Sequence, residues 1–352
     1  MKRHLINALK FAVSAAIIAW LVAKARQDPH FDELISGGKS WPALAAATLL
    51  SLAAVVVTII RWYYLVRALE IPFRMTDAFR LGFLGYLFNF VSLGSVGGDL
   101  FKAVFIARER PGRRTEAVAT VVIDRIIGLY GLFVVATAAV LITGQLGSPV
   151  PEVQIICKAT LVTTGVGAIA ILALLTPGFT SGTVSEMVAG IPKLGPLLDK
   201  LIRAVRIYRR KPGVLALSLL LSLAVHVLTA GSVYLVARGL PGVTPSLAAH
   251  YVMVPLATLT GVLPLPMSGL GAFEAALEFL YRHLPDGTAA DASKGLVTAL
   301  GYRVISMLIA LIGLGYYLRG RREVADVLHD AREGEAPAEP DLRDDAAVAQ
   351  RS

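Results

Sequence analysis

The stretch LPLPMSGLGAFE, residues 263–274, interrupts a long apolar segment with two prolines, two glycines and a carboxylate. Proline and glycine break a helix, and Glu274 follows this break at once. Within a bilayer, a broken helix and a charged side chain are tolerated only where protein or a water-filled cavity covers them. The stretch therefore predicts a functional site in a membrane protein, formed by Pro266, Gly269, Gly271 and Glu274.

A second stretch, LGSVGGD at residues 93–99, has the same order of residue types. Small residues that include Gly97 and Gly98 come first, and Asp99 then opens a helix. We interpret it as the counterpart of the later stretch.

The composition predicts an all-α polytopic membrane protein. Hydrophobic residues make up 55% of the chain, the mean hydropathy is +0.66, and several segments approach the ~20 apolar residues that cross a bilayer. The lone cysteine, Cys157, excludes an intramolecular disulfide. The net charge of +9 is concentrated in a few loops, which on a membrane chain indicates orientation rather than nucleic-acid binding.

The basic loops favour six full spans and two re-entrant hairpins. If residues 81–98 crossed the membrane fully, the basic cluster at 102–114 would face outside, opposite the basic loop before it. The positive-inside rule opposes that arrangement. The spans are predicted at residues 5–23, 43–60, 117–143, 158–176, 213–237 and 296–318, with hairpins at 81–98 and 246–281. Both termini are then cytoplasmic, residues 144–157 lie outside, and the basic stretch at 200–211 suits a surface helix.

Two positions in the first spans leave alternatives open. Ala23-Lys24-Ala25 is similar to a signal-peptidase site, but we favour a retained first span because residues 5–23 are nearly long enough to cross. Arg61 starts a basic-aromatic run, which is typical of a span end where arginine extends towards the headgroups, and we also count it among the candidate residues of the headgroup cavity.

The pattern of spans and hairpins predicts an inverted repeat. Unit one, residues 43–143, has a span, a hairpin with Asp99 and a span with Asp124 and Arg125. Unit two, residues 213–318, has a span, a hairpin with Glu274 and a span with Arg303. Asp99 precedes Arg125 by 26 positions, and Glu274 precedes Arg303 by 29. Such repeats with broken helices are common in transporters. We assign residues 1–320 to this membrane domain and 321–352 to a disordered acidic tail.

The ionisable residues of the spans allow two interpretations, because each costs roughly 2.5–3.5 kcal/mol at a helix centre. They could be ion pairs that only fix helix packing. Alternatively, they line a cavity for a charged headgroup, with Arg125 and Arg303 meeting phosphate and Asp99 and Glu274 meeting a cation or balancing the arginines. Exposed amides near Gly97 and Gly271 would then add an anion site.

Other site types find little support. Gly38-Lys39-Ser40 ends like a phosphate-binding loop, but the first glycine of that motif would fall at Glu33, so ATP hydrolysis is not expected. His226 is a lone histidine in a span, which we interpret as a hydrogen-bonded packing residue. There is no His-Glu-x-x-His pattern or cysteine pair for zinc, so we expect no metal and no cofactor.

The chain resembles the membrane domain of lysylphosphatidylglycerol synthases and its stand-alone, flippase-like relatives. The resemblance covers about residues 1–320 and rests on Gly94-Ser-Val-Gly-Gly-Asp-Leu-Phe-Lys-Ala, Asp124-Arg125, the Pro/Gly/Glu stretch at 264–274, Tyr302-Arg303 and Arg61-Trp62. It implies movement of a lipid between leaflets. After Arg322 only a short tail follows, too small for an aminoacyl-transferase domain, so synthase activity is not expected. Asp99 stands where such families often carry glutamate.

The leading hypothesis is a flippase of the bacterial inner membrane that moves a lipid with a charged headgroup. Its partner would be a phospholipid or another polar lipid, and no nucleic acid. One alternative is a membrane transferase for lipid-linked sugars with Asp99 or Glu274 as base. Another is a scaffold that recruits a cytoplasmic lipid-synthesis enzyme through the basic helix and the acidic tail.

Overall fold

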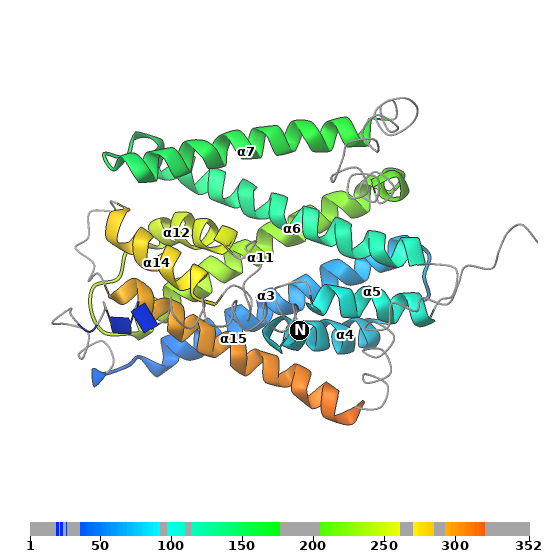
Figure 1. Ribbon diagram of the computed structural model, residues 1–352, viewed down its shortest axis with the longest axis horizontal. Helices are drawn as coiled ribbons and strands as arrows, with labels where there is room; N and C mark the ends of the chain where they lie inside the picture. The colour runs from blue at the N-terminus through cyan, green and yellow to red at the C-terminus, as the bar shows by residue number, and fades with distance from the viewer. Residues whose placement is uncertain are drawn as a thin grey trace, which may run out of the picture.

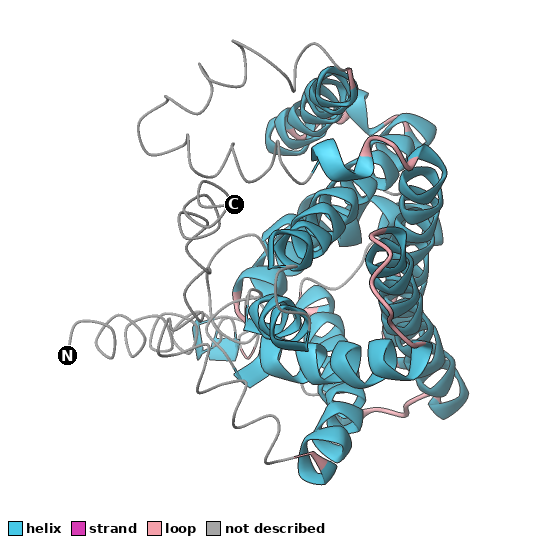
Figure 2. Cartoon of the chain, turned by 90° about the vertical axis from the view of Figure 1, so that its right-hand side faces the viewer, coloured by secondary structure: helices cyan, strands magenta, loops and turns pink. Residues whose placement is uncertain are grey.

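The structure, a computed structural model, describes residues 36–91, 97–109, 114–176, 205–260, 270–284 and 293–320, with a few positions between 19 and 26. Within these residues the regular structure is helical, with no strand (Figure 2). The helices are α3 (Trp41–Ala68), α4 (Met75–Val91), α5 (Gly97–Glu109), α6 (Arg114–Thr143), the 3₁₀ turn η1 (Gln145–Gly147), α7 (Pro151–Leu175), α11 (Pro212–Gly239), α12 (Leu247–Leu259), α14 (Ala272–His283) and α15 (Lys294–Arg319). This confirms the all-α class.

In the part of the chain that the structure describes, five helices are long and apolar enough to cross a membrane: α3, α6, α7, α11 and α15. At about 1.5 Å per residue they are about 38–45 Å long, more than the ~30 Å hydrocarbon core requires. They correspond to five of the six predicted spans. The remaining one, at 5–23, lies almost wholly outside the described residues, and so do residues 200–204 of the predicted surface helix at 200–211.

Two of the long helices extend seven or more residues beyond the predicted spans. α7 begins at Pro151, where the fixed φ of proline suits the first helical position, so Cys157 is buried in a helix instead of lying in an outer loop. α3 continues to Ala68, one residue past Arg67 and well beyond the predicted end at 60. The run that starts at Arg61 is therefore inside a helix.

Helices α3 and α11 form an antiparallel pair in the middle of the bundle. At one end the Ser40 amide donates to the Gly239 carbonyl over 2.9 Å, and further along the Ser51 and Ser232 hydroxyls are 2.8 Å apart. At the other end the Tyr208 hydroxyl donates to the Leu65 carbonyl over 2.8 Å. Burial raises the pKa of Tyr208 above its ordinary value, so the phenol remains a neutral donor.

Four shorter helices form two pairs, α4 with α5 and α12 with α14, towards opposite ends of the long axis (Figure 1). With 12 to 17 residues, they are about 18–26 Å long and shorter than the hydrocarbon core. α4 also packs against α15, and α12 also packs against α6. Each short pair thus contacts a long helix that is distant in sequence.

A buried lysine ties the end of α11 to the start of α15. Lys294 is 0% exposed, and its ammonium donates to the carbonyls of Pro241 and Gly242 over 2.8 and 2.6 Å. It also lies 3.0 Å from the Thr244 hydroxyl. Because these acceptors belong to the loop after α11, the buried ammonium joins this loop to the start of α15 through charge-assisted hydrogen bonds.

Replacing Lys294 with methionine is expected to lower the free energy of unfolding by about 2–4 kcal/mol, because the loop after α11 loses the charge-assisted hydrogen bonds that join it to α15. Thermal unfolding in detergent micelles measures the change. Lys158→Met is the matched control, since Lys158 is exposed on α7 and bonds to Gln154. Equal melting temperatures for both variants would contradict the role given to Lys294.

Candidate functional site

The first half of the site begins where α5 starts, close against α4. The Gly98 amide donates to the Asn89 side-chain oxygen over 3.1 Å. A Cβ at Gly98 would lie 2.0 Å from the Gly85 carbonyl oxygen, so only glycine permits this approach. The contact fixes Asp99, the next residue, in the first turn of α5.

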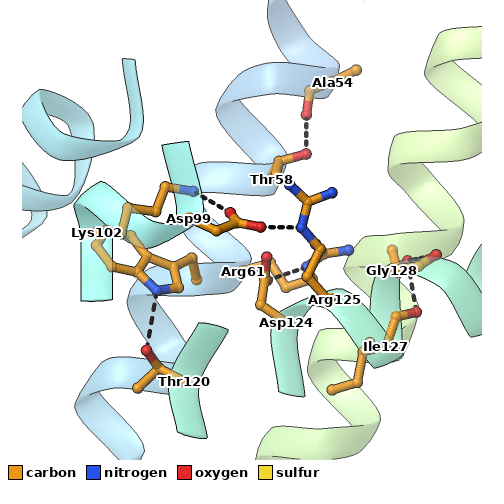
Figure 3. A network of polar contacts seen from close by, with 12 residues as sticks. Ala54, Thr58, Arg61, Asp99, Lys102, Thr120, Asp124, Arg125, Ile127 and Gly128 are labelled. Carbon is orange, nitrogen blue, oxygen red and sulfur yellow. Dashed lines mark hydrogen bonds and ion pairs between the residues drawn. The ribbon is translucent and has the colours of Figure 1, made fainter. Parts of the chain in front are cut away.

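Asp99 lies between two cations (Figure 3). One carboxylate oxygen accepts from Arg125 Nε on α6, and the other lies 4.0 Å from Lys102 Nζ, one turn along α5. The side chains of Asp99 and Lys102 are 12% and 11% exposed, whereas that of Arg125 is 48% exposed. Arg125 is therefore the accessible member of this group.

Arg61 and Asp124 form a second ion pair beside the first. Arg61 Nε donates to Asp124 Oδ1 over 2.8 Å, and both side chains are less than a tenth exposed. The interpretation of Arg61 as a headgroup anchor was wrong, because α3 continues past it and its guanidinium faces α6 rather than water. Its neighbour Trp62 is also buried and donates to Thr120 over 3.4 Å.

The later stretch contributes to an ion pair of one carboxylate and one arginine, Glu274 and Arg303. Gly271, with φ 92°, is the N-cap of α14, a conformation that favours glycine. The Gly271 amide donates to Glu274 Oε2 over 2.7 Å, and the other oxygen accepts from Arg303 Nε over 2.8 Å. Glu274 is 0% exposed. It therefore caps its own helix and joins α14 to α15.

The charged residues described at the site, which are the predicted ones and Lys102, fall into two groups that we name by their carboxylates. The Asp99 cluster comprises Arg61, Asp99, Lys102, Asp124 and Arg125. The Glu274 pair comprises Glu274 and Arg303, with Gly271 beside it. Gly97 opens α5, whereas Pro266 and Gly269 lie outside the described residues.

Two contributors were missed by sequence reasoning. Lys102 stands three residues after Asp99, a spacing that places both side chains on one helix face, so it could have been found. Its ammonium also lies 5.0 Å from the centre of the Trp62 ring. Asn89 carries no sequence signal, because it acts only through the close contact of α4 with α5.

His226 is a packing residue, as predicted. Its Nε2 lies 2.9 Å from the Gly128 carbonyl oxygen on α6. Within the described residues, no three histidine, cysteine or acidic side chains are grouped so that they could hold a metal ion.

Fold and site together define an integral membrane protein of apolar helices with ion pairs buried between them. The chain belongs to the family of the lysylphosphatidylglycerol synthase transmembrane region, whose model matches residues 7–313. This membership indicates a function connected with membrane lipids, and the match is to a membrane region rather than to an aminoacyl-transferase domain. A comparison with curated proteins found no match.

Proposed function

We propose that this protein moves a lipid with a charged headgroup between the leaflets of the bacterial inner membrane. One observation carries the proposal. Two carboxylate–arginine pairs, Asp99 with Arg125 and Glu274 with Arg303, each join a short helix that begins at or directly after a glycine to a long apolar helix. Charged groups inside a membrane domain are costly and mark substrate pathways more often than packing.

The two units, residues 43–143 and 213–318, form an inverted repeat in this proposal. Each has a long helix, a short pair and a second long helix, in the same order. The contact of α4 with α15 has its counterpart in the contact of α12 with α6, and the short pairs lie towards opposite ends of the molecule (Figure 1). In both cases the first short helix of one unit packs against the last long helix of the other unit. Such reciprocal contacts support a two-fold relation between the units.

The short pairs are re-entrant hairpins that approach from opposite sides of the membrane. None of their helices reaches the length of the hydrocarbon core, and the second of each pair carries the site carboxylate. With the basic loops on the cytoplasmic side, the α4–α5 hairpin enters from the cytoplasm and both termini lie there.

Transport would proceed by exchange of ionic partners. A headgroup phosphate can replace Asp99 on the half-exposed Arg125, while the acyl chains stay in lipid. Rocking of one unit against the other then opens the site to the opposite leaflet, as in other transporters built from inverted repeats. The cost of taking the headgroup out of water is offset by charges that are already in place.

The test is a leaflet-sidedness assay in proteoliposomes with fluorescent lipids. Asp99→Asn is expected to slow lipid movement by at least about 10-fold, the equivalent of one charge-assisted hydrogen bond. Lys158→Met should match the parent. If no lipid crosses in the presence of the parent protein but lipids are chemically altered, the chain is a transferase and the proposal fails.

A further inference from the structure

Among the described residues, the Glu274 pair has no net charge, whereas the Asp99 cluster has a net positive charge. Glu274 and Arg303 form a neutral pair, and so do Arg61 and Asp124. Asp99 faces two cations, Arg125 and Lys102. Among the described residues, the Asp99 cluster therefore has three cations and two carboxylates. The chain segment between α4 and α5, residues 92–96, contributes no charged residue.

The excess positive charge sits where water screens it poorly. Lys102 has an 11% exposed side chain, with the Trp62 ring on one side and the Asp99 carboxylate 4.0 Å away. A buried cation in excess costs free energy unless an anion joins it. Arg125, half exposed and bonded to the same carboxylate, provides access from outside to this positive region.

The Glu274 pair offers no such site. Both oxygens of Glu274 are engaged, one with the Gly271 amide and one with Arg303, and the carboxylate is fully buried. Its charges cancel, and the Arg303 side chain is 11% exposed. An incoming anion would have to break a satisfied pair to bind there.

We propose that the Asp99 cluster is an anion subsite for the phosphate of a lipid headgroup whose net charge is negative. Arg125 contacts the phosphate, and Lys102 supplies the balancing charge behind it. This inference rests on the proposed function and narrows its substrate: anionic lipids are preferred over zwitterionic lipids and over cationic aminoacylated ones. With such a ligand bound, the cluster becomes neutral.

Binding can be measured with a probe that the protein already contains. Trp62 lies beside Lys102, whereas Trp20 and Trp41 are exposed and can be replaced with phenylalanine. Titrating this Trp62-only protein in micelles with phosphatidylglycerol should give a saturable fluorescence change, and phosphatidylcholine should not. Inorganic phosphate and glycerol phosphate form separate arms, because a soluble phosphate that binds equally well would overturn the assignment to a lipid.

The decisive variant is Lys102→Met, which leaves Asp99 and Arg125 as a neutral pair. It should weaken phosphatidylglycerol binding by at least about 10-fold, about 1.4 kcal/mol. Lys158→Met, which removes one exposed positive charge, should bind like the parent. Unchanged binding in Lys102→Met, with a melting temperature like that of the parent, would overturn the subsite.

A transport measurement separates this inference from the function on which it rests. The parent should move phosphatidylglycerol at least about 10-fold faster than phosphatidylcholine or lysylphosphatidylglycerol, and Lys102→Met should reduce that ratio towards one. Equal movement of all three by the parent would overturn the anionic preference and leave the flippase standing. Saturable phosphatidylglycerol binding without movement of any lipid would overturn the flippase and leave the anion subsite standing.

Discussion

Replacing Arg303 with methionine is expected to lower the free energy of unfolding by about 3–5 kcal/mol, because it leaves the Glu274 carboxylate buried beside an apolar side chain. Glu274 is 0% exposed and receives 2.8 Å hydrogen bonds from Arg303. The remaining donor, the Gly271 amide, cannot balance a full charge. Thermal unfolding in micelles measures the loss, and it should exceed that of Lys294→Met.

A double variant distinguishes a packing role of the Glu274–Arg303 pair from a role in transport. Glu274→Gln combined with Arg303→Met removes both charges, so most of the lost stability should return, since a buried ion pair can often be replaced by neutral groups at little cost. Lipid movement should nevertheless remain at least about 10-fold below the parent rate. Restored movement together with restored stability would show that the pair serves packing alone.

The sequence was sufficient to locate the two glycine-rich stretches that precede the buried carboxylates, and most of the spans. Glu274 and Asp99 stood out because each follows a glycine-rich break in an apolar segment, and the structure places each in the first turn of a helix. The five spans were predictable because apolar length is a local property of the chain. Features of this kind need no knowledge of tertiary contacts.

The choice of ionic partners was not predictable to the same degree. Adjacent residues of a helix point about 100° apart, so Asp124 and Arg125 face different neighbours, and Asp124 binds Arg61 while Arg125 binds Asp99. The burial of Arg61 follows from the contact of α3 with α6, which its basic-aromatic surroundings do not indicate. The hydrogen bonds of Lys294 were not predictable for the same reason, because its acceptors lie about 50 residues earlier in the chain.

The other large effect is expected from Gly98→Ala. An ideal Cβ at this position would lie 2.0 Å from the Gly85 carbonyl oxygen and 2.8 Å from the Asn89 side-chain oxygen. Because one of these atoms belongs to the backbone, α4 and α5 must move apart, and the hydrogen bond from the Gly98 amide is lost. We expect a stability loss of about 1–3 kcal/mol, the usual cost of overpacking.

The displacement reaches the site directly, since Asp99 follows Gly98 and its bond to Arg125 depends on the start of α5. Lipid movement should fall at least as far as in Asp99→Asn, although every charged group is retained. Gly213→Ala in α11 is the matched control, because a Cβ there meets no atom within 4 Å. A Gly98→Ala protein that moves lipid at the parent rate would show that the close approach of α4 and α5 does not position the carboxylate.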